Sequence, residues 1–189
     1  MKNILIAVGA IALIGILMVS YSNSTYNSAI KYQEEVDETF ADIQVDYQRR
    51  ADLIPQLIAT VKGAAENEKE ILFGVTNARA GIVSAKSPGD LEAAGRKINT
   101  AINLAFEAYP QIRSTANFSE FQAQLEGTEN RISVSRKKYN LAVKVYNAHI
   151  RGKFRKMAIG WFGEEGEFEK KELFQAISKD AEIAPTVEF

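Results

Sequence analysis

The longest apolar run in the chain lies at its N-terminus. Residues 4–19, ILIAVGAIALIGILMV, contain no charged or strongly hydrogen-bonding side chain, and Ser20 and Tyr21 extend the run. A membrane-spanning helix needs about 17–25 apolar residues, whereas the apolar core of a signal peptide has about 7–15. The length therefore favours a retained transmembrane anchor over residues 4–22. Cleavage is the alternative, because Ser20 and Ser22 fit a weak small-x-small site.

The positive charges around this run indicate its direction. Lys2 and the terminal amine precede the run, and the next basic residue is Lys31. Because flanking Lys and Arg stay on the cytoplasmic side, we expect residues 1–3 to form a short cytoplasmic N-terminus. The remaining chain would then lie outside the bacterial cytoplasmic (inner) membrane, with membrane lipid as a partner of the anchor.

The part of the chain after the anchor has the apolar spacing of helices. Between residues 24 and 150, apolar side chains recur at intervals of three and four, which indicates an all-α fold. The last stretch repeats every seven residues, as is typical of long, nearly aligned helices. Its heptad positions are Phe118, Leu125, Ile132, Tyr139 and Tyr146, and the second seam holds Phe121, Thr128, Ser135 and Ala142.

These patterns divide the chain into an anchor, a bundle and an extension. We expect residues 23–163 to form an antiparallel up-down four-helix bundle, preceded by one transmembrane helix. Residues 164–189 would form a C-terminal extension, with a short helix near 166–178 and a loose tail.

Capping sequences mark several helix ends. In SPGD, Ser87 is the expected N-cap, followed by Pro88 at the first helical position and Asp90 in the first turn. In NFSE, Asn117 is the expected N-cap of the last long helix. Tyr109, which precedes a proline, is expected to end the third helix.

The segment RRADLIPQLIATVKG, residues 49–63, leaves two interpretations open. The helical phase continues through Pro55, which favours one kinked helix from about residue 24 to residue 84. A proline inside a helix costs about 3 kcal/mol, and the partner helices could cover only half of such a rod. We therefore expect the chain to turn near Asp52, with Asp52 as N-cap and Pro55 in the first turn of the second helix.

A turn there brings two oppositely charged stretches together. Residues 34–46 carry only acidic charges and residues 131–163 only basic ones, so we expect them to neutralise each other where the last helix descends beside the first. Each exposed pair contributes only about 0–1 kcal/mol. The same geometry returns Ile150 to the membrane. Candidate membrane-surface residues follow it: Arg151, Lys153, Arg155, Lys156, Trp161 and Phe162.

Several stretches resemble the LemA family of bacterial membrane proteins. They are YQRRADLIPQLIATVKGAA at 47–65, NAR at 77–79, EAYPQI at 107–112, NFSEFQAQLEGTENRISVSRKKYNLAVKVYN at 117–147 and FG at 162–163. The resemblance covers nearly all of the chain after the anchor. It implies a single N-terminal anchor, a cytoplasmic N-terminus and an extracytoplasmic antiparallel helical bundle. It transfers no catalytic residue, because no activity is established for the family.

The residue content argues against catalytic and metal chemistry. The sequence has no cysteine, and its one histidine is His149, which we expect to have a structural or solvent role at a helix end. A zinc site of the usual type needs more such ligands, and neither a Glu-x-x-His pair nor a glycine-rich phosphate-binding motif occurs. We therefore expect no catalytic site, no cofactor and no metal.

Two polar groups are candidates for either function or packing. Arg49, Arg50 and Asp52 could bind a partner at the membrane-distal tip, or close the turn by capping and ion pairing. A polar layer in the last long helix could bind a partner or fix the register of that helix. It consists of Thr128, Glu129, Asn130 and Arg131.

The net charge of −1 gives the chain no overall attraction to nucleic acid. Together with the expected anchor, the helical bundle and the lack of catalytic motifs, it favours a non-catalytic scaffold or interaction module of the bacterial envelope. Its expected partner is an unidentified envelope protein, and association between copies of the chain stays open. The alternative is a ligand-binding or hydrolytic enzyme that acts on envelope lipid or peptidoglycan.

Overall fold

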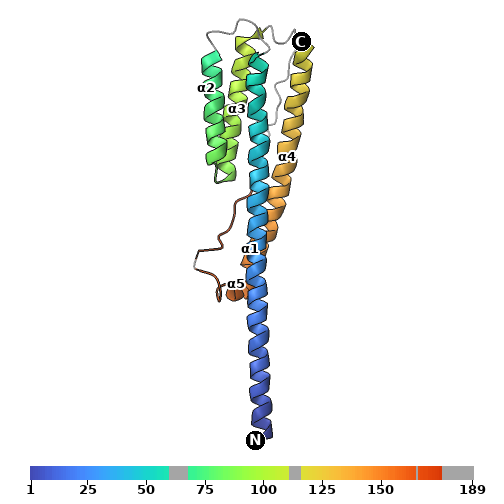
Figure 1. Cartoon of the computed structure of the whole chain (residues 1–189), viewed down its shortest axis with the longest axis vertical. Helices are drawn as coiled ribbons and strands as arrows, with labels where there is room; N and C mark the ends of the chain where they lie inside the picture. Colours follow the sequence, from blue (N-terminus) through green and yellow to red (C-terminus); the bar gives the residue numbers. More distant parts are fainter. Residues whose placement is uncertain (60–67, 111–115, 165, 176–189) are drawn as a thin grey trace.

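The computed structural model describes residues 1–59, 68–110, 116–164 and 166–175. Its helices are α1 (Lys2–Ala59), α2 (Glu68–Ser84), α3 (Pro88–Ala108), α4 (Ala116–Arg151) and α5 (Lys153–Ile159). Figure 1 shows α1 running through the whole length of the molecule, with α2, α3 and α4 packed around its second half. The chain ascends in α1, descends in α2, ascends in α3 and descends in α4, which confirms the all-α, antiparallel four-helix prediction.

The apolar run and the first bundle helix form one continuous helix. α1 has no break near residue 22, and the side chains of residues 1–21 are exposed. Among the described helices, α1 is the one long and apolar enough to cross a membrane. An exposed apolar run of this length is compatible with a membrane anchor, and in the structure it continues directly into the bundle.

The predicted turn near Asp52 is wrong. Helix α1 continues through Asp52 and Pro55 to Ala59, so Asp52 does not cap a second helix. The single kinked helix to residue 84 is also wrong, because α2 begins separately at Glu68 and is antiparallel to α1.

Burial explains why α1 tolerates Pro55. The residues around it, Leu53, Ile54, Leu57 and Ile58, are all buried. Burying each such side chain contributes about 1.5–3 kcal/mol, which together exceeds the cost of about 3 kcal/mol for an interior proline. Because Pro55 lies near the end of α1, its missing N–H also disturbs little of the helix.

The predicted ends of α3 are confirmed, whereas the predicted start of α4 is not. Ser87 caps α3, with its hydroxyl accepting a hydrogen bond from the Asp90 N–H at 3.2 Å and the Asp90 carboxylate accepting one from the Ser87 N–H at 3.0 Å. The Asp90 carboxylate also accepts a hydrogen bond from the Lys86 N–H at 3.0 Å, and this bond, with those to Ser87, lowers the pKa of Asp90. Tyr109 ends α3. Helix α4 starts at Ala116, so Asn117 lies inside it and is not its N-cap.

The lower end of α4 returns to the middle of α1. His149 is buried, and its Nε2 donates a hydrogen bond to the Thr25 carbonyl oxygen at 2.9 Å, since a carbonyl can only accept. Its ring also packs edge-on against Tyr32, 5.1 Å away between centroids. These contacts give His149 a packing role and confirm that Ile150 comes back to the side of the apolar run.

The acidic and basic stretches lie on neighbouring helices but do not pair directly. Among the described residues, no ion pair joins residues 34–46 to residues 131–163. Within residues 34–46, the acidic side chains are exposed except that of Asp46, which is buried. Exposed charges gain little from pairing because water already solvates them. The expected mutual neutralisation by close pairs is therefore wrong for this part of the chain.

After α4, the chain first packs on α1 and then runs back along the bundle (Figure 1). Gly152 separates α4 from the short helix α5. Residues 166–175 form no helix, so the short helix expected near 166–178 is absent from the described part, and residues 176–178 lie outside it. The main chain at Lys171 and Phe174 bonds instead to side chains of α4.

Candidate functional site

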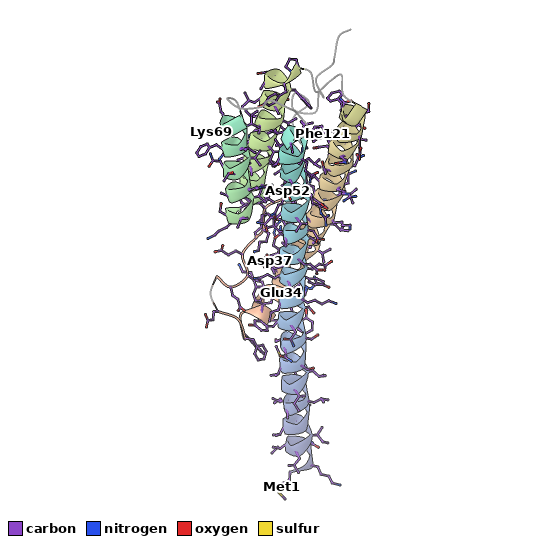
Figure 2. The ribbon with its side chains drawn as sticks, turned by 45° about the horizontal axis from the view of Figure 1, so that its top comes forward. Met1, Glu34, Asp37, Asp52, Lys69 and Phe121 are labelled. Atoms are coloured by element: carbon purple, nitrogen blue, oxygen red, sulfur yellow. The ribbon has the colours of Figure 1, made fainter. Side chains whose placement is uncertain are left out.

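An open groove of about 620 Å³ lies between α1 and α4, at the end of the bundle away from the apolar run. Figure 2 places Asp52 on α1 and Phe121 near the start of α4 at this end, with Met1 at the other. The small residues Ala123 and Gly127 are four apart and share one face of α4, which leaves room for the groove. The lining residues are Arg49, Asp52, Leu53, Gln56, Glu120, Ala123, Gln124, Gly127, Thr128 and Arg131.

Two of the three candidate partner-binding residues, Arg49 and Asp52, line this groove. The side chain of Arg49 is 56% exposed, and its Nη1 donates a hydrogen bond to Asp46 at 3.2 Å. Asp52 accepts a hydrogen bond from Arg79 of α2. Both side chains remain partly exposed, so the groove presents a cation and an anion to whatever enters it.

Arg50, the third candidate, instead joins α1 to α4. Its side chain is only 16% exposed and forms an ion pair with Glu129. Burial lowers the pKa of Arg50; the phenol of Tyr47 opposes this shift and the charge of Arg136 adds to it. Glu129 is 53% exposed, so water can solvate its charge without Arg50, but loss of Glu129 would leave the largely buried Arg50 charge without its partner; Arg50 therefore serves packing here.

The four residues of the predicted register layer have different environments. Thr128 and Arg131 line the groove, and the Thr128 hydroxyl donates to the Leu125 carbonyl of its own helix at 2.8 Å. Glu129 pairs with Arg50, and Asn130 is exposed. Helix α4 continues through all four without interruption.

A polar contact between helices that the sequence reasoning did not single out lies further along the α1–α4 interface. Ser135 donates a hydrogen bond to the buried Asp46 at 2.6 Å, and Arg136 donates one to the hydroxyl of Tyr47. The signal was present: Ser135 occupies the same heptad seam as Thr128, and Asp46 follows the buried Ile43 by one helical turn.

The candidate membrane-surface residues gather where the apolar run ends. Arg151, Lys153, Arg155, Lys156, Trp161 and Phe162 are all exposed, and all belong to α5 or its flanks. Beside them lies an apolar pocket of about 110 Å³, lined by Met18, Tyr21, Ser22, Phe154, Met157, Ala158 and Trp161. Basic and aromatic side chains thus surround the point where α1 leaves the bundle.

This end is also tied to the segment that follows α5. The hydroxyl of Tyr26 donates to Glu167 at 2.8 Å, and its ring packs against Phe168 at 5.6 Å and Phe162 at 6.4 Å. The hydrogen bond to Glu167, with smaller effects from burial and nearby carboxylates, raises the pKa of Tyr26. The segment is therefore folded against α1 at this point.

The titratable groups of the described chain show two features, one concerning metal ligands and one concerning buried phenols. No three His, Asp or Glu side chains there gather in a way that could hold a metal ion. The pKa of Tyr139 and that of Tyr146 are each raised to about 12, mainly by burial and further by Asp37. Both phenols are therefore neutral near pH 7.

Comparison with known proteins finds the same family as the sequence motifs. The model of the LemA family matches residues 39–189, which include the groove and the whole bundle beyond the middle of α1. Protein LemA of Metamycoplasma hominis is 25% identical over 128 residues, which cover 66% of this chain and 58% of that protein. The chain thus spans less than two thirds of the length of this curated relative.

Proposed function

Because the chain belongs to the LemA family, we propose that it is a single-pass protein of the bacterial cytoplasmic membrane and a non-catalytic interaction module of the envelope. The bundle lies outside the membrane, and the groove between α1 and α4 receives an envelope protein. The observation that carries this proposal is the position of the groove, an open site lined by Arg49, Asp52 and Arg131 at the end opposite the anchor.

The continuous helix α1 supports the anchored arrangement. Its exposed apolar run, residues 4–19, suits a bilayer, and Lys2 before the run favours a cytoplasmic N-terminus. Because no break separates the run from the bundle, α1 acts as a stalk that sets the height of the groove above the membrane.

Helix α5 and its flanks support contact with the lipid surface. Phe154 is 76% exposed and Met157 56% exposed, beside the cations Lys153, Arg155 and Lys156. Aromatic and basic side chains of this kind favour the headgroup region, where apolar rings can enter the bilayer while cations stay in water. The bundle would then stand upright on its membrane-proximal end.

The polar lining of the groove defines the kind of partner it fits. Arg49 and Arg131 offer guanidinium groups that bind carboxylates through paired hydrogen bonds. Glu120 and Asp52 lie in the same groove, so a surface with both acidic and basic side chains is complementary. Charges of this kind select the correct partner more than they strengthen its binding.

Site-directed photo-crosslinking in living cells tests this proposal. A photoreactive amino acid at Gln124, in the groove, should give a discrete adduct with one envelope protein, and Arg49→Glu with Arg131→Glu should abolish it. The matched control is Glu126, which is exposed on the same helix but does not line the groove. Equal adducts from both positions, or an adduct indifferent to the charge reversals, would overturn the proposal.

A further inference from the structure

Two asparagines of α4 hold the segment that follows α5 by its main chain. Asn140 donates to the Phe174 carbonyl at 3.0 Å and accepts from the Phe174 N–H at 2.9 Å. Asn147 does the same with Lys171, donating to its carbonyl at 2.9 Å and accepting from its N–H at 3.0 Å. An asparagine amide has both a donor and an acceptor, so each side chain binds both polar groups of one residue.

The spacing of the asparagines matches an extended chain. Residues seven apart on a helix share a face and are separated by about 10.5 Å at 1.5 Å per residue. Residues three apart in an extended chain are separated by about 10 Å at 3.3 Å per residue. Asn140 and Asn147 can therefore bind two residues of an extended peptide that are three positions apart. Because the bonds involve only the main chain, the peptide's side chains do not limit this match.

Side-chain contacts add selectivity at the two bound residues. Phe174 is 5% exposed, packs edge-on against Tyr139 at 5.3 Å and lies 5.2 Å from the guanidinium of Arg136. Lys171 reaches Asp37 of α1 at 3.4 Å. The face thus favours a basic residue followed, three positions later, by an aromatic one.

The hydroxyl of Tyr146 on this face is unused by the segment. Tyr139, which precedes Asn140, donates its hydroxyl to the Glu172 carbonyl at 3.1 Å. Tyr146 precedes Asn147 in the same way and is fully buried, yet its hydroxyl has no hydrogen-bond partner among the described residues. A buried hydroxyl without a partner is unfavourable. The chain's own segment therefore fits this Tyr-Asn repeat incompletely.

The segment buries few of its own side chains. Of residues 169–175, Phe174 alone is buried, and Glu172, Leu173 and Gln175 are exposed. A segment with one buried side chain can leave and return without opening the core formed by the four long helices. Apart from Phe174, which packs into the hydrophobic core, the contacts of residues 171–174 with α4 are main-chain hydrogen bonds, as in a bound peptide.

We propose that the Tyr139-Asn140 and Tyr146-Asn147 repeat is a peptide-binding site, occupied here by the chain's own residues 171–174. Its ligand is an extended peptide of another protein with a basic residue and, three residues later, an aromatic residue. The resident segment competes with that ligand and keeps the site closed in its absence. This site is separate from the distal groove, so either can fail without the other.

Peptide binding to the full chain in lipid nanodiscs tests the proposal. The probe is a fluorescent peptide of residues 167–175, EFEKKELFQ, measured by fluorescence anisotropy. A Phe174→Ala chain, whose own segment has lost its anchor, should bind the peptide at least tenfold more tightly than the unchanged chain. Adding Asn140→Asp and Asn147→Asp should weaken binding at least tenfold, since a carboxylate cannot donate to the peptide carbonyls.

Two controls separate main-chain recognition from general effects. Asn99 is exposed on α3, so Asn99→Asp in the Phe174→Ala chain should leave the affinity unchanged. A peptide methylated at the amide nitrogens that correspond to Lys171 and Phe174 should bind at least tenfold more weakly, with no change in the protein. Undiminished binding of the methylated peptide, or no binding to the Phe174→Ala chain, would overturn the proposal.

Discussion

Asp46 of α1 and Ser135 of α4 meet across the bundle, with 2.6 Å between the carboxylate Oδ2 and the hydroxyl Oγ. The other oxygen of Asp46 accepts from Arg49 at 3.2 Å. Asp46 is buried in spite of its charge, and buried carboxylates are stable only when hydrogen bonds replace water. This contact therefore fixes the axial alignment of α1 and α4 at the level of these two residues.

The first prediction concerns the removal of this carboxylate. Asp46→Ala leaves Ser135 without its acceptor and should lower the free energy of unfolding by about 1–3 kcal/mol. Denaturant titration followed by circular dichroism measures the change. Asp42 is exposed on the same helix, and Asp42→Ala should change stability by less than about 0.5 kcal/mol. Equal effects of the two variants would contradict an interior role for Asp46.

The second prediction concerns Pro55, which lies inside α1. Pro55→Ala restores an N–H that can bond to the Ala51 carbonyl and removes the clash of the ring with it. Because Pro55 is near the helix end, we expect a gain of about 1–2 kcal/mol, below the full interior value. Chemical denaturation measures it. A loss of stability would instead fit a proline that starts a separate helix, where its fixed φ is favourable.

The sequence pattern predicted the helices better than the point where the chain reverses. Heptad and three-four spacing correctly indicated four packed helices, and SPGD gave the start of α3 because capping chemistry is local. The turn near Asp52 was predicted from the cost of an interior proline and from the length of rod that the partner helices could cover. Both arguments failed because α1 continues past Pro55 with Ile54, Leu57 and Ile58 buried around it. Tertiary burial, which no single stretch reveals, decided the outcome.

The residues of the candidate site could be predicted in part from the sequence. Arg49, Asp52, Thr128 and Arg131 stood out as polar residues in helical stretches, and the antiparallel arrangement of α1 and α4 brings them into one groove. The binding of residues 171–174 by α4 was not predicted. Main-chain hydrogen bonds do not require particular side chains, so the sequence of the bound segment gives no sign of them. The Tyr-Asn repeat on α4 is by itself also typical of a helix face that packs in a core.

The third prediction is a loss of stability at high pH. The raised pKa of Tyr139 and of Tyr146, each to about 12 from the usual 10.0, means that folding favours the neutral phenols. Their contribution is fully present below pH 10 and is lost as the pH rises from about 10 to about 12, where the unfolded chain ionises first. Absorbance at 295 nm and denaturant titration across this range should show the late ionisation and the loss.

Two substitutions separate the tyrosines. Tyr146→Phe removes a buried hydroxyl that has no partner among the described residues, so it should leave stability at pH 7 unchanged or increased and reduce the alkaline loss. Tyr139→Phe also reduces the alkaline loss but removes the hydrogen bond to the Glu172 carbonyl, so it should cost about 1 kcal/mol at pH 7. An unchanged alkaline loss in both variants would mean that other groups cause it.

The fourth prediction concerns the direction of the chain in the membrane. The sequence has no cysteine, so one introduced cysteine reports its own location without background. Glu126→Cys, on an exposed position of α4, should react with a membrane-impermeant maleimide in intact cells. Asn3→Cys, which precedes the apolar run, should react only after the membrane is permeabilised, because Lys2 favours retention of this end in the cytoplasm. The opposite pattern would place the bundle in the cytoplasm, and labelling of both positions in intact cells would show that the run does not separate two compartments.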